Sequence, residues 1–187
     1  TTVHAGITEL LFKEGKAAHL VFAPTNSANG IGDGSLHIDP NGMTISGWVS
    51  TGGFCWRDPK DRPYKLYFVA CFNTSFSNYG VWKGSRQQTG QADVEGDDMA
   101  AFVSFGELKD KTVKMKMAIS YVSINNAKEN LEREINHWDF DRIYESTKAQ
   151  WADYLSRIRV TGGTEAERQT FYTAVYHNLL HPNIYND

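Results

Sequence analysis

The chain has 187 residues, of which 41% are hydrophobic and 22% charged, and this balance is ordinary for a soluble globular protein. Its formal net charge of −3 gives no electrostatic footprint for nucleic acid or an anionic membrane surface. No apolar run approaches the roughly twenty residues of a membrane span. We therefore expect neither nucleic acid nor a membrane span. The first residues, TTVHAGITELLFKEG, lack the pattern of a signal peptide, which fits a cytosolic protein or a mature or trimmed piece.

The first two thirds of the chain predict β-strands. The stretches 7–12 and 16–24 suggest two strands. Over 35–46, apolar residues alternate on either side of the turn residues Asp39–Gly42, which predict a hairpin. A nearly continuous apolar run, 64–72, predicts a buried strand with these residues on one face: Tyr64, Leu66, Phe68, Ala70 and Phe72.

Two more strands are predicted around the polar turn 107–111. In the second, Val113, Met115, Met117 and Ile119 face one way. Lys114 and Lys116 face the other way, which is typical of a half-buried strand in an antiparallel sheet. Because no helices alternate with the strands, the pattern favours a β-sandwich over a parallel sheet.

After about Ser123 the hydrophobic period becomes helical. Ala127, Leu131 and Ile135 recur every four residues, with Ser123, Asn125 or Asn126 as candidate N-caps. A second helix has Asp139 as its predicted N-cap and this apolar stripe: Phe140, Ile143, Tyr144, Thr147, Trp151, Leu155 and Ile158.

A third helix is predicted to begin with the capping box of Thr164 and Glu167. Its stripe contains Phe171, Ala174, Val175 and Leu179, and Pro182 is expected to end it. We expect this stripe to be poorly covered within the chain, which favours self-association or partner binding.

Two clusters could hold a metal, and both have simpler interpretations. His177 and His181 have the spacing at which two imidazoles on one helix face share a metal, but no third ligand is implied, so contacts between helices are favoured. The acidic stretch 91–98 could offer oxygen ligands to calcium, but a solvated loop between strands is favoured. The sequence therefore predicts no metal ligand. Cys71 reads as a small buried hydrophobe, and its pairing with Cys55 stays open.

The loop 50–63 is the best candidate for contact with a ligand. Paired glycines precede Phe54, Cys55 and Trp56, and aromatic side chains on a loop held by a rigid sandwich commonly meet ligands. Trp56 could stack on a sugar ring, or the loop could fold back onto the sandwich edge. Glycoside hydrolysis needs two carboxyl groups that flank the bond, and no such pair stands out.

Three stretches together resemble glycoside hydrolase family 92. AISYVSINNAKENLEREI resembles the segment in which that family leaves its β-sandwich for a helical linker. WADYLSRIRVTGGTEAERQTFYTAVYHNLLHPNIYND resembles the linker helix and the first helix of the catalytic barrel, and GWVSTGGFCWRDPKDRPYKLYFVACF resembles a sandwich segment. The order of the three segments also agrees with the family.

The resemblance implies a mainly β fold: an antiparallel β-sandwich, then linker helices and the start of an (α/α) toroid. The expected bounds are 1–122, 123–160 and 161–187. It also implies an exo-acting α-mannosidase, expected to prefer α-1,2 linkages, that inverts configuration with calcium assistance on mannose-containing glycans. Secretion or a periplasmic location is expected from the family alone.

The chain departs from the family pattern at both ends. The family's opening glycine- and histidine-rich stretch is not present, nor is most of the toroid with the acid, the base and the calcium ligands. The resemblance therefore implies an internal fragment whose partner is the remainder of its own catalytic domain. By analogy, the expected sugar contacts are Phe54, Cys55, Trp56, Asn183 and Asp187. The alternative is a non-catalytic carbohydrate-binding sandwich with Trp56 or Trp82 as a stacking platform.

Overall fold

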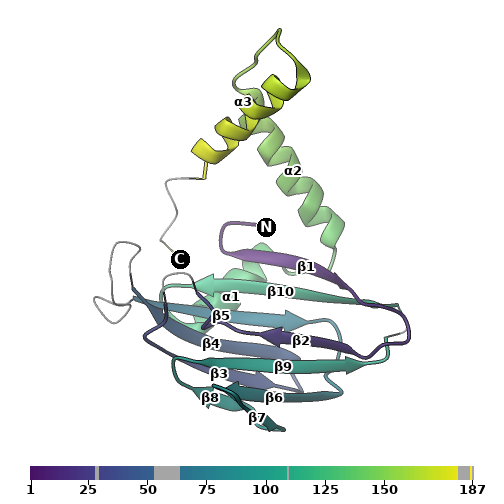
Figure 1. Cartoon of the computed structure of the whole chain (residues 1–187), viewed down its shortest axis with the longest axis vertical. Coiled ribbons are helices and arrows are strands. Elements are labelled where there is room, and N and C mark those ends of the chain that lie inside the picture. Colours follow the sequence, from purple (N-terminus) through teal and green to yellow (C-terminus); the bar gives the residue numbers. More distant parts are fainter. Residues whose placement is uncertain (28–29, 53–63, 109, 181–185, 187) are drawn as a thin grey trace.

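The computed structural model describes residues 1–27, 30–52, 64–108, 110–180 and 186, which form two antiparallel sheets and three helices (Figure 1). One sheet has six strands in the order β1 (Ala5–Leu11), β10 (Thr112–Ser120), β5 (Tyr64–Phe72), β4 (Thr44–Thr51), β3 (Asp33–Asp39) and β8 (Asp93–Glu95). The other has four strands in the order β2 (Ala18–Phe22), β9 (Met99–Gly106), β6 (Asn78–Lys83) and β7 (Arg86–Thr89).

The main core lies between the two sheets, as the predicted β-sandwich requires. Inward-facing side chains of both sheets are completely or almost completely buried, among them Leu36, Ile45, Phe72 and Val103. The predicted inner faces of β5 and β10 are confirmed for Phe68, Ala70, Phe72 and Val113, which belong to this core. Tyr64, predicted on the same face of β5, is instead 43% exposed at the start of the strand. The alternation of apolar and polar residues therefore determines which face of each strand is buried.

The hairpin of β3 and β4 is confirmed, with Ile38 opposite Ile45. The prediction of a solvated loop over 91–98 is wrong in part, because β8 lies within it and pairs with β3. Val94 lies opposite Leu36 between two acidic residues of β8 and is only 7% exposed. Burial of this one apolar side chain favours the pairing of β8 with β3. The sequence RQQT of β7 has no apolar residue, and neither β6 nor β7 was predicted.

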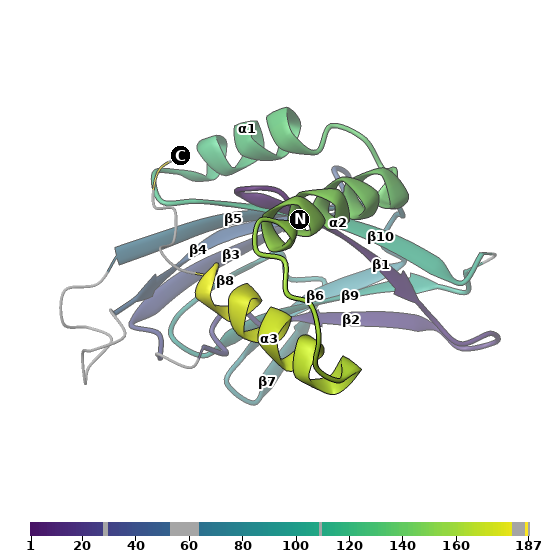
Figure 2. The ribbon, with the colours of Figure 1, turned by 90° about the horizontal axis from the view of Figure 1, so that it is seen from above.

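The outer face of the six-stranded sheet is covered where β1, β10 and β5 lie. The first helix, α1 (Ile124–Glu134), lies over this face (Figure 2). Its Ala127 and Leu131 pack against the sheet, and together with Ile135, directly after the helix, they belong to a second apolar cluster. The prediction that β10 is a half-buried strand is therefore wrong for the face that carries its lysines. Lys116 is only 9% exposed, because α1 and the turn after it cover that side of the strand.

The helix starts agree with the predicted caps. Ser123 caps α1, Asp139 caps α2 (Phe140–Ser156), and Thr164 forms the capping box of α3 (Glu165–Asn178) with Glu167. The last helix ends at Asn178, before Pro182, which lies outside the described residues.

Coverage by tertiary contacts decreases from α1 to α3. Only Ile143 of the predicted α2 stripe is buried, and α3 has no buried residue, which confirms its poor coverage. None of the helices described is both long and apolar enough to cross a membrane. The three domain bounds remain a prediction.

Candidate functional site

The predicted sugar contacts Phe54, Cys55, Trp56, Asn183 and Asp187 all lie outside the described residues. The strands on either side of the 53–63 segment pair with each other, and Thr51 at the end of β4 lies opposite Tyr64 at the start of β5. The Thr51 hydroxyl donates to the Gly30 carbonyl at 2.9 Å. The two attachment points of this loop are therefore held side by side by the sheet.

Four aromatic side chains lie at this end of the sheet, and of these only Tyr64 was named from the sequence, as part of the buried face of its strand. Trp48 is paired with Tyr67 across β4 and β5, and the Lys65 ammonium lies 3.7 Å from the centre of a Trp48 ring. Tyr64 is 43% exposed, and its ring centre is 6.0 Å from that of Tyr121. For the other three, the only signal in the sequence was the overall richness in aromatic residues.

A pocket of about 450 Å³ lies between the outer face of the sheet and the α1–α2 turn. Its walls combine apolar side chains with charges of both signs, and they include Val69, Cys71, Lys116, Leu131, Glu132 and Trp138. Cys71 has a free thiol, and burial raises the pKa of that thiol above its usual value. This half-buried cysteine packs with the second apolar cluster, in agreement with its reading as a small hydrophobe.

Lys116 supports one wall of this pocket. Its ammonium donates to the Ile135 carbonyl at 3.0 Å and lies 4.5 Å from the centre of a Trp138 ring. Burial lowers the pKa of Lys116, because desolvation disfavours the charged form. The arrangement attaches the end of α1 to the sandwich through a hydrogen bond and a cation–π contact.

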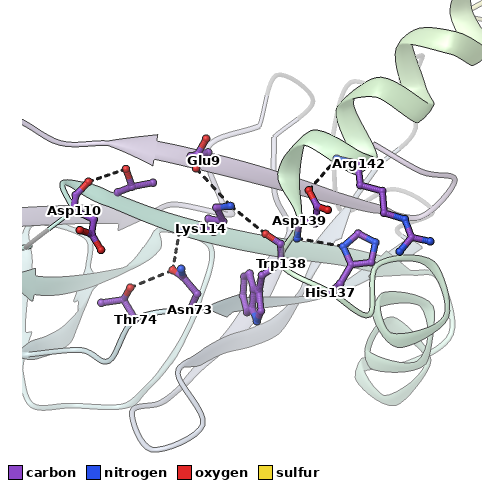
Figure 3. A network of polar contacts seen from close by, with 10 residues as sticks. Glu9, Asn73, Thr74, Asp110, Lys114, His137, Trp138, Asp139 and Arg142 are labelled. Atoms are coloured by element: carbon purple, nitrogen blue, oxygen red, sulfur yellow. Dashed lines mark hydrogen bonds and ion pairs between the residues drawn. The ribbon is translucent and has the colours of Figure 1, made fainter.

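Lys114, two residues before Lys116 on β10, makes a matching attachment to a carbonyl three residues after Ile135 (Figure 3). Its ammonium donates to the Trp138 carbonyl at 3.2 Å and is 3.6 Å from a Glu9 oxygen on β1. In the same turn, the backbone N–H of Asp139 donates to His137 Nδ1 at 3.2 Å. The two lysines of β10 thus bind carbonyl groups at both ends of the connection between α1 and α2.

A second pocket of about 340 Å³ lies between β1 and α2. It is lined largely by apolar and aromatic side chains, including Ile7, Phe140, Ile143, Tyr144 and Trp151. Tyr144 is 51% exposed, and its ring stacks on that of Phe140 with 6.1 Å between the ring centres. This surface has few groups that could perform acid or base chemistry, and its composition is that of a packing surface.

A polar junction connects β1, α1 and the end of the chain. His4 Nδ1 lies 2.6 Å from Glu134 Oε1, and its Nε2 lies 2.7 Å from the carbonyl oxygen of Asn186. Burial raises the pKa of Glu134, but hydrogen bonds from Thr2 and from the backbone and ring of His4 outweigh it, so the pKa lies below its usual value. No local pattern in the sequence marks either His4 or Glu134 as a member of this junction.

Metal ligands are not gathered in the part of the chain that the structure describes, where no group of three or more His, Cys, Asp and Glu residues could hold an ion. Asp93 of the acidic stretch is instead paired with His37 at 2.7 Å on an exposed surface. The histidine pair considered as metal ligands cannot be assessed together, because His177 belongs to the described residues and His181 lies outside them. Trp82, the other candidate stacking platform, lies half-buried on β6.

The strand-rich and the helical parts of the chain each match a model of a known protein family. The model of the glycosyl hydrolase family 92 N-terminal domain matches residues 1–120, and that of the family's catalytic domain matches residues 126–187. A curated "uncharacterized secreted glycosidase" from Arthroderma benhamiae is 26% identical over 77 residues, which cover 39% of this chain and 10% of that protein.

Solved structures show the same fold. A family GH92 inverting mannosidase from Bacteroides thetaiotaomicron VPI-5482 is 26% identical, with a TM-score of 0.83, and the match covers 96% of this chain and 23% of that one. A GH92 α-mannosidase from Bacteroides thetaiotaomicron is 23% identical, with a TM-score of 0.85 over 100% of this chain and 25% of that one. The chain thus spans about a quarter of each.

The N-terminal-domain model accounts for the sandwich, and the catalytic-domain model begins within α1 and extends through α3. The order of the two matches along the chain is the order of sheet and helix in the structure. The chain belongs to glycosyl hydrolase family 92.

Proposed function

We propose that this chain is part of an exo-acting α-mannosidase that removes terminal α-linked mannose from glycans with inversion of configuration. The observation that carries the proposal is the succession of the two family matches along one chain, over 1–120 and 126–187. The 26% identity to an inverting mannosidase supports the substrate class and the stereochemistry.

The proposed chemistry requires two carboxyl groups on opposite sides of the glycosidic bond. One protonates the leaving oxygen, and the other activates a water molecule on the opposite face of the sugar. The described residues of this chain do not assign either role, so we expect the 187 residues alone to be inactive. Their proposed contribution is contact with the sugar, through Phe54, Cys55 and Trp56 of the loop and through the tail residues Asn183 and Asp187.

Three further properties belong to the proposal. We expect an α-1,2 preference and a secreted or periplasmic location, and the match to a secreted glycosidase supports the latter. Calcium is also expected. The described residues do not offer a cluster of ligands for it, so the ion would be held by other parts of the enzyme, and no step is assigned to it here.

The second and third helices supply the proposed contact with the remainder of the catalytic domain. The large exposed apolar and aromatic side chains in these helices and directly after them are Tyr144, Tyr154, Ile158, Tyr176, Leu179 and Leu180. The catalytic-domain match includes both helices, and the solved relatives are about four times longer than this chain. We infer that further helices of that domain cover these side chains.

Activity of the complete protein that contains this chain tests the proposal. An aryl α-mannoside and mannobioses of different linkage would be supplied, and the anomer first released would be followed by proton NMR. We expect initial release of β-mannose, the fastest turnover on the α-1,2 disaccharide, and loss of activity with a chelator.

Each result addresses a separate part of the proposal. Initial release of α-mannose would contradict inversion, and full activity in a chelator would contradict the role of calcium. No turnover of any α-mannoside by the folded complete protein would contradict the mannosidase assignment. Turnover by the pure 187-residue chain would show that it carries its own acid and base.

A further inference from the structure

The outer face of the four-stranded sheet carries aromatic side chains that the proposed function does not use. Val81 on β6 and Val103 on β9 are completely buried in the core between the sheets. Because side chains alternate along a strand, Gly80, Trp82 and Phe102 belong to the opposite face. Both aromatic side chains are half-buried there. The sheet therefore has an aromatic surface, formed by Trp82 and Phe102, on the side away from its core.

The Phe102 ring lies over the backbone of the neighbouring strand. Phe102 pairs with Gly80, and a Cβ atom added at Gly80 would lie 2.6 Å and 2.7 Å from two carbons of that ring. The ring thus fills the space that a side chain at this position would need. Trp82 is the next outward-facing residue of β6 and a diagonal neighbour of Phe102, which places the two side chains within reach of each other. The glycine therefore allows two rings to lie side by side on the sheet.

Uncharged polar groups border the aromatic surface. On β7, Gln87 lies opposite Trp82, and Thr89 follows on the same face; both are exposed. Within the part of the chain that the structure describes, the side chains of these three residues have no hydrogen-bond partner. Amide and hydroxyl groups donate and accept hydrogen bonds, as sugar hydroxyls do. The charged residues of this hairpin, Lys83 and Arg86, belong by alternation to the other face. The surface is therefore complementary to a neutral ligand.

The helices pack on the other sheet. Their main contacts are with β1, β4, β5 and β10, which all belong to the six-stranded sheet. In Figure 1, α2 and α3 lie at one end of the molecule, and β6 and β7 lie toward the opposite end. The catalytic-domain match includes these two helices. The aromatic surface thus lies away from the side on which we infer further helices, so a soluble ligand fits it better than those helices do.

We propose that Trp82 and Phe102 form a platform on which this domain binds a neutral oligosaccharide, with Gln87 and Thr89 hydrogen-bonding its hydroxyl groups. Aromatic side chains bury a large area in such contacts, and here they stack on the apolar faces of sugar rings. The four residues bind the ligand and take no part in bond cleavage. That the oligosaccharide contains mannose rests on the proposed function, but the platform itself does not.

NMR titration of the isotope-labelled 187-residue chain tests the platform without any assay of activity. The probes are an α-1,2-linked mannotetraose and, separately, cellotetraose. We expect the Trp82 indole N–H, the Phe102 ring and the Thr89 methyl signals to shift together and to saturate, while the Trp151 indole signal on α2 stays unchanged. Saturation with cellotetraose alone would support the platform and contradict only the mannose assignment. Unchanged platform signals with both probes would overturn the proposal.

Variants of the same chain measure what the platform contributes to affinity. Trp82→Ala should weaken binding by about tenfold or more, as the loss of a central aromatic contact commonly does, and Trp82→Tyr should retain most of the affinity. The matched control is Trp151→Ala, which removes another half-buried tryptophan and should leave the affinity unchanged. Unchanged affinity in folded Trp82→Ala would contradict the platform.

Two further results keep the proposal open to refutation. Gln87→Ala changes only an exposed side chain and should weaken binding about two- to tenfold through one lost hydrogen bond, so unchanged affinity would contradict the platform even if Trp82→Ala does not fold. Shifts of the platform signals on dilution without sugar would show that a second copy of the chain covers this face, and would overturn the proposal. Inactivity of the complete enzyme on mannosides would leave all of these results unaffected.

Discussion

The helices α1 and α3 have similar local sequences and opposite tertiary environments. Each begins at a hydroxyl N-cap and carries apolar residues every four positions, Ala127, Leu131 and Ile135 in one and Phe171, Val175 and Leu179 in the other. The side chains in and directly after α1 are at most 5% exposed. In α3, Phe171 and Val175 are only half-buried, and Leu179, directly after the helix, is 43% exposed. Helix formation is a local property, but burial depends on what the rest of the chain provides.

The difference also extends to the polar contacts. The end of α1 is bonded to β1 and β10 through His4 and Lys116. The polar contacts of α3 are local: its own capping box, the contacts of Arg168 with neighbouring glycine carbonyls, and the Tyr172 hydroxyl on the Ile158 carbonyl after α2. We therefore expect α1 to unfold with the sandwich and α3 to unfold largely by itself.

Leu131→Ala should lower the free energy of unfolding by about 2–5 kcal/mol, because it leaves a cavity between α1 and the sheet. The matched change Leu179→Ala in α3 should cost less than about 0.5 kcal/mol, since that side chain is exposed. Urea unfolding monitored by tryptophan fluorescence measures both. Equal losses would mean that the two helices are not energetically different.

Glu134→Gln should lower the free energy of unfolding by about 1–3 kcal/mol at neutral pH, because it weakens charged hydrogen bonds between α1 and His4. The pKa of Glu134 is lowered in the folded protein, so its stabilising contribution is present above the ordinary glutamate pKa and is lost as the pH falls through the lowered value.

Urea titrations of the wild type and Glu134→Gln at a series of acidic pH values measure this difference. The two curves should converge at low pH. A constant difference across the acidic range would show that the loss has another cause.

Ser123→Ala should lower the free energy of global unfolding by about 0.5–2 kcal/mol, because the side chain caps a helix that folds with the sandwich. Thr164→Ala removes a comparable cap from α3, and we expect faster amide exchange in α3 with little change in global unfolding. Hydrogen exchange combined with urea unfolding measures both effects. A global loss in Thr164→Ala as large as that in Ser123→Ala would contradict the independence of α3.

Lys116→Met should remove a small stabilisation that develops at alkaline pH. Because the pKa of Lys116 is lowered on folding, the unfolded chain binds more protons between that value and the ordinary lysine pKa, and stability rises with pH in this window. The rise should be absent in the variant and retained in Lys148→Met, a matched change at an exposed lysine. Thermal unfolding at increasing alkaline pH gives the comparison.

The features that could be predicted from the sequence are local ones. The turn 39–42 between β3 and β4, the side-chain alternation of β5 and β10, and the caps Ser123, Asp139 and Thr164 all depend on residues a few positions apart, whose preferences need no distant partner. The family resemblance supplied the sandwich-to-helix order in the same way, from contiguous stretches of residues.

Three features depend on contacts across the fold and could not be predicted: the pairing of β8 with β3, the burial of Lys116 and the junction of His4 with Glu134 and Asn186. The partners in that junction are 130 and 182 positions apart. Their contacts form only after the sheet has brought β1 beside β10 and α1 has covered the outer face. The energy of such contacts depends on burial and distance in space, and neither can be read from the spacing of residues along the chain.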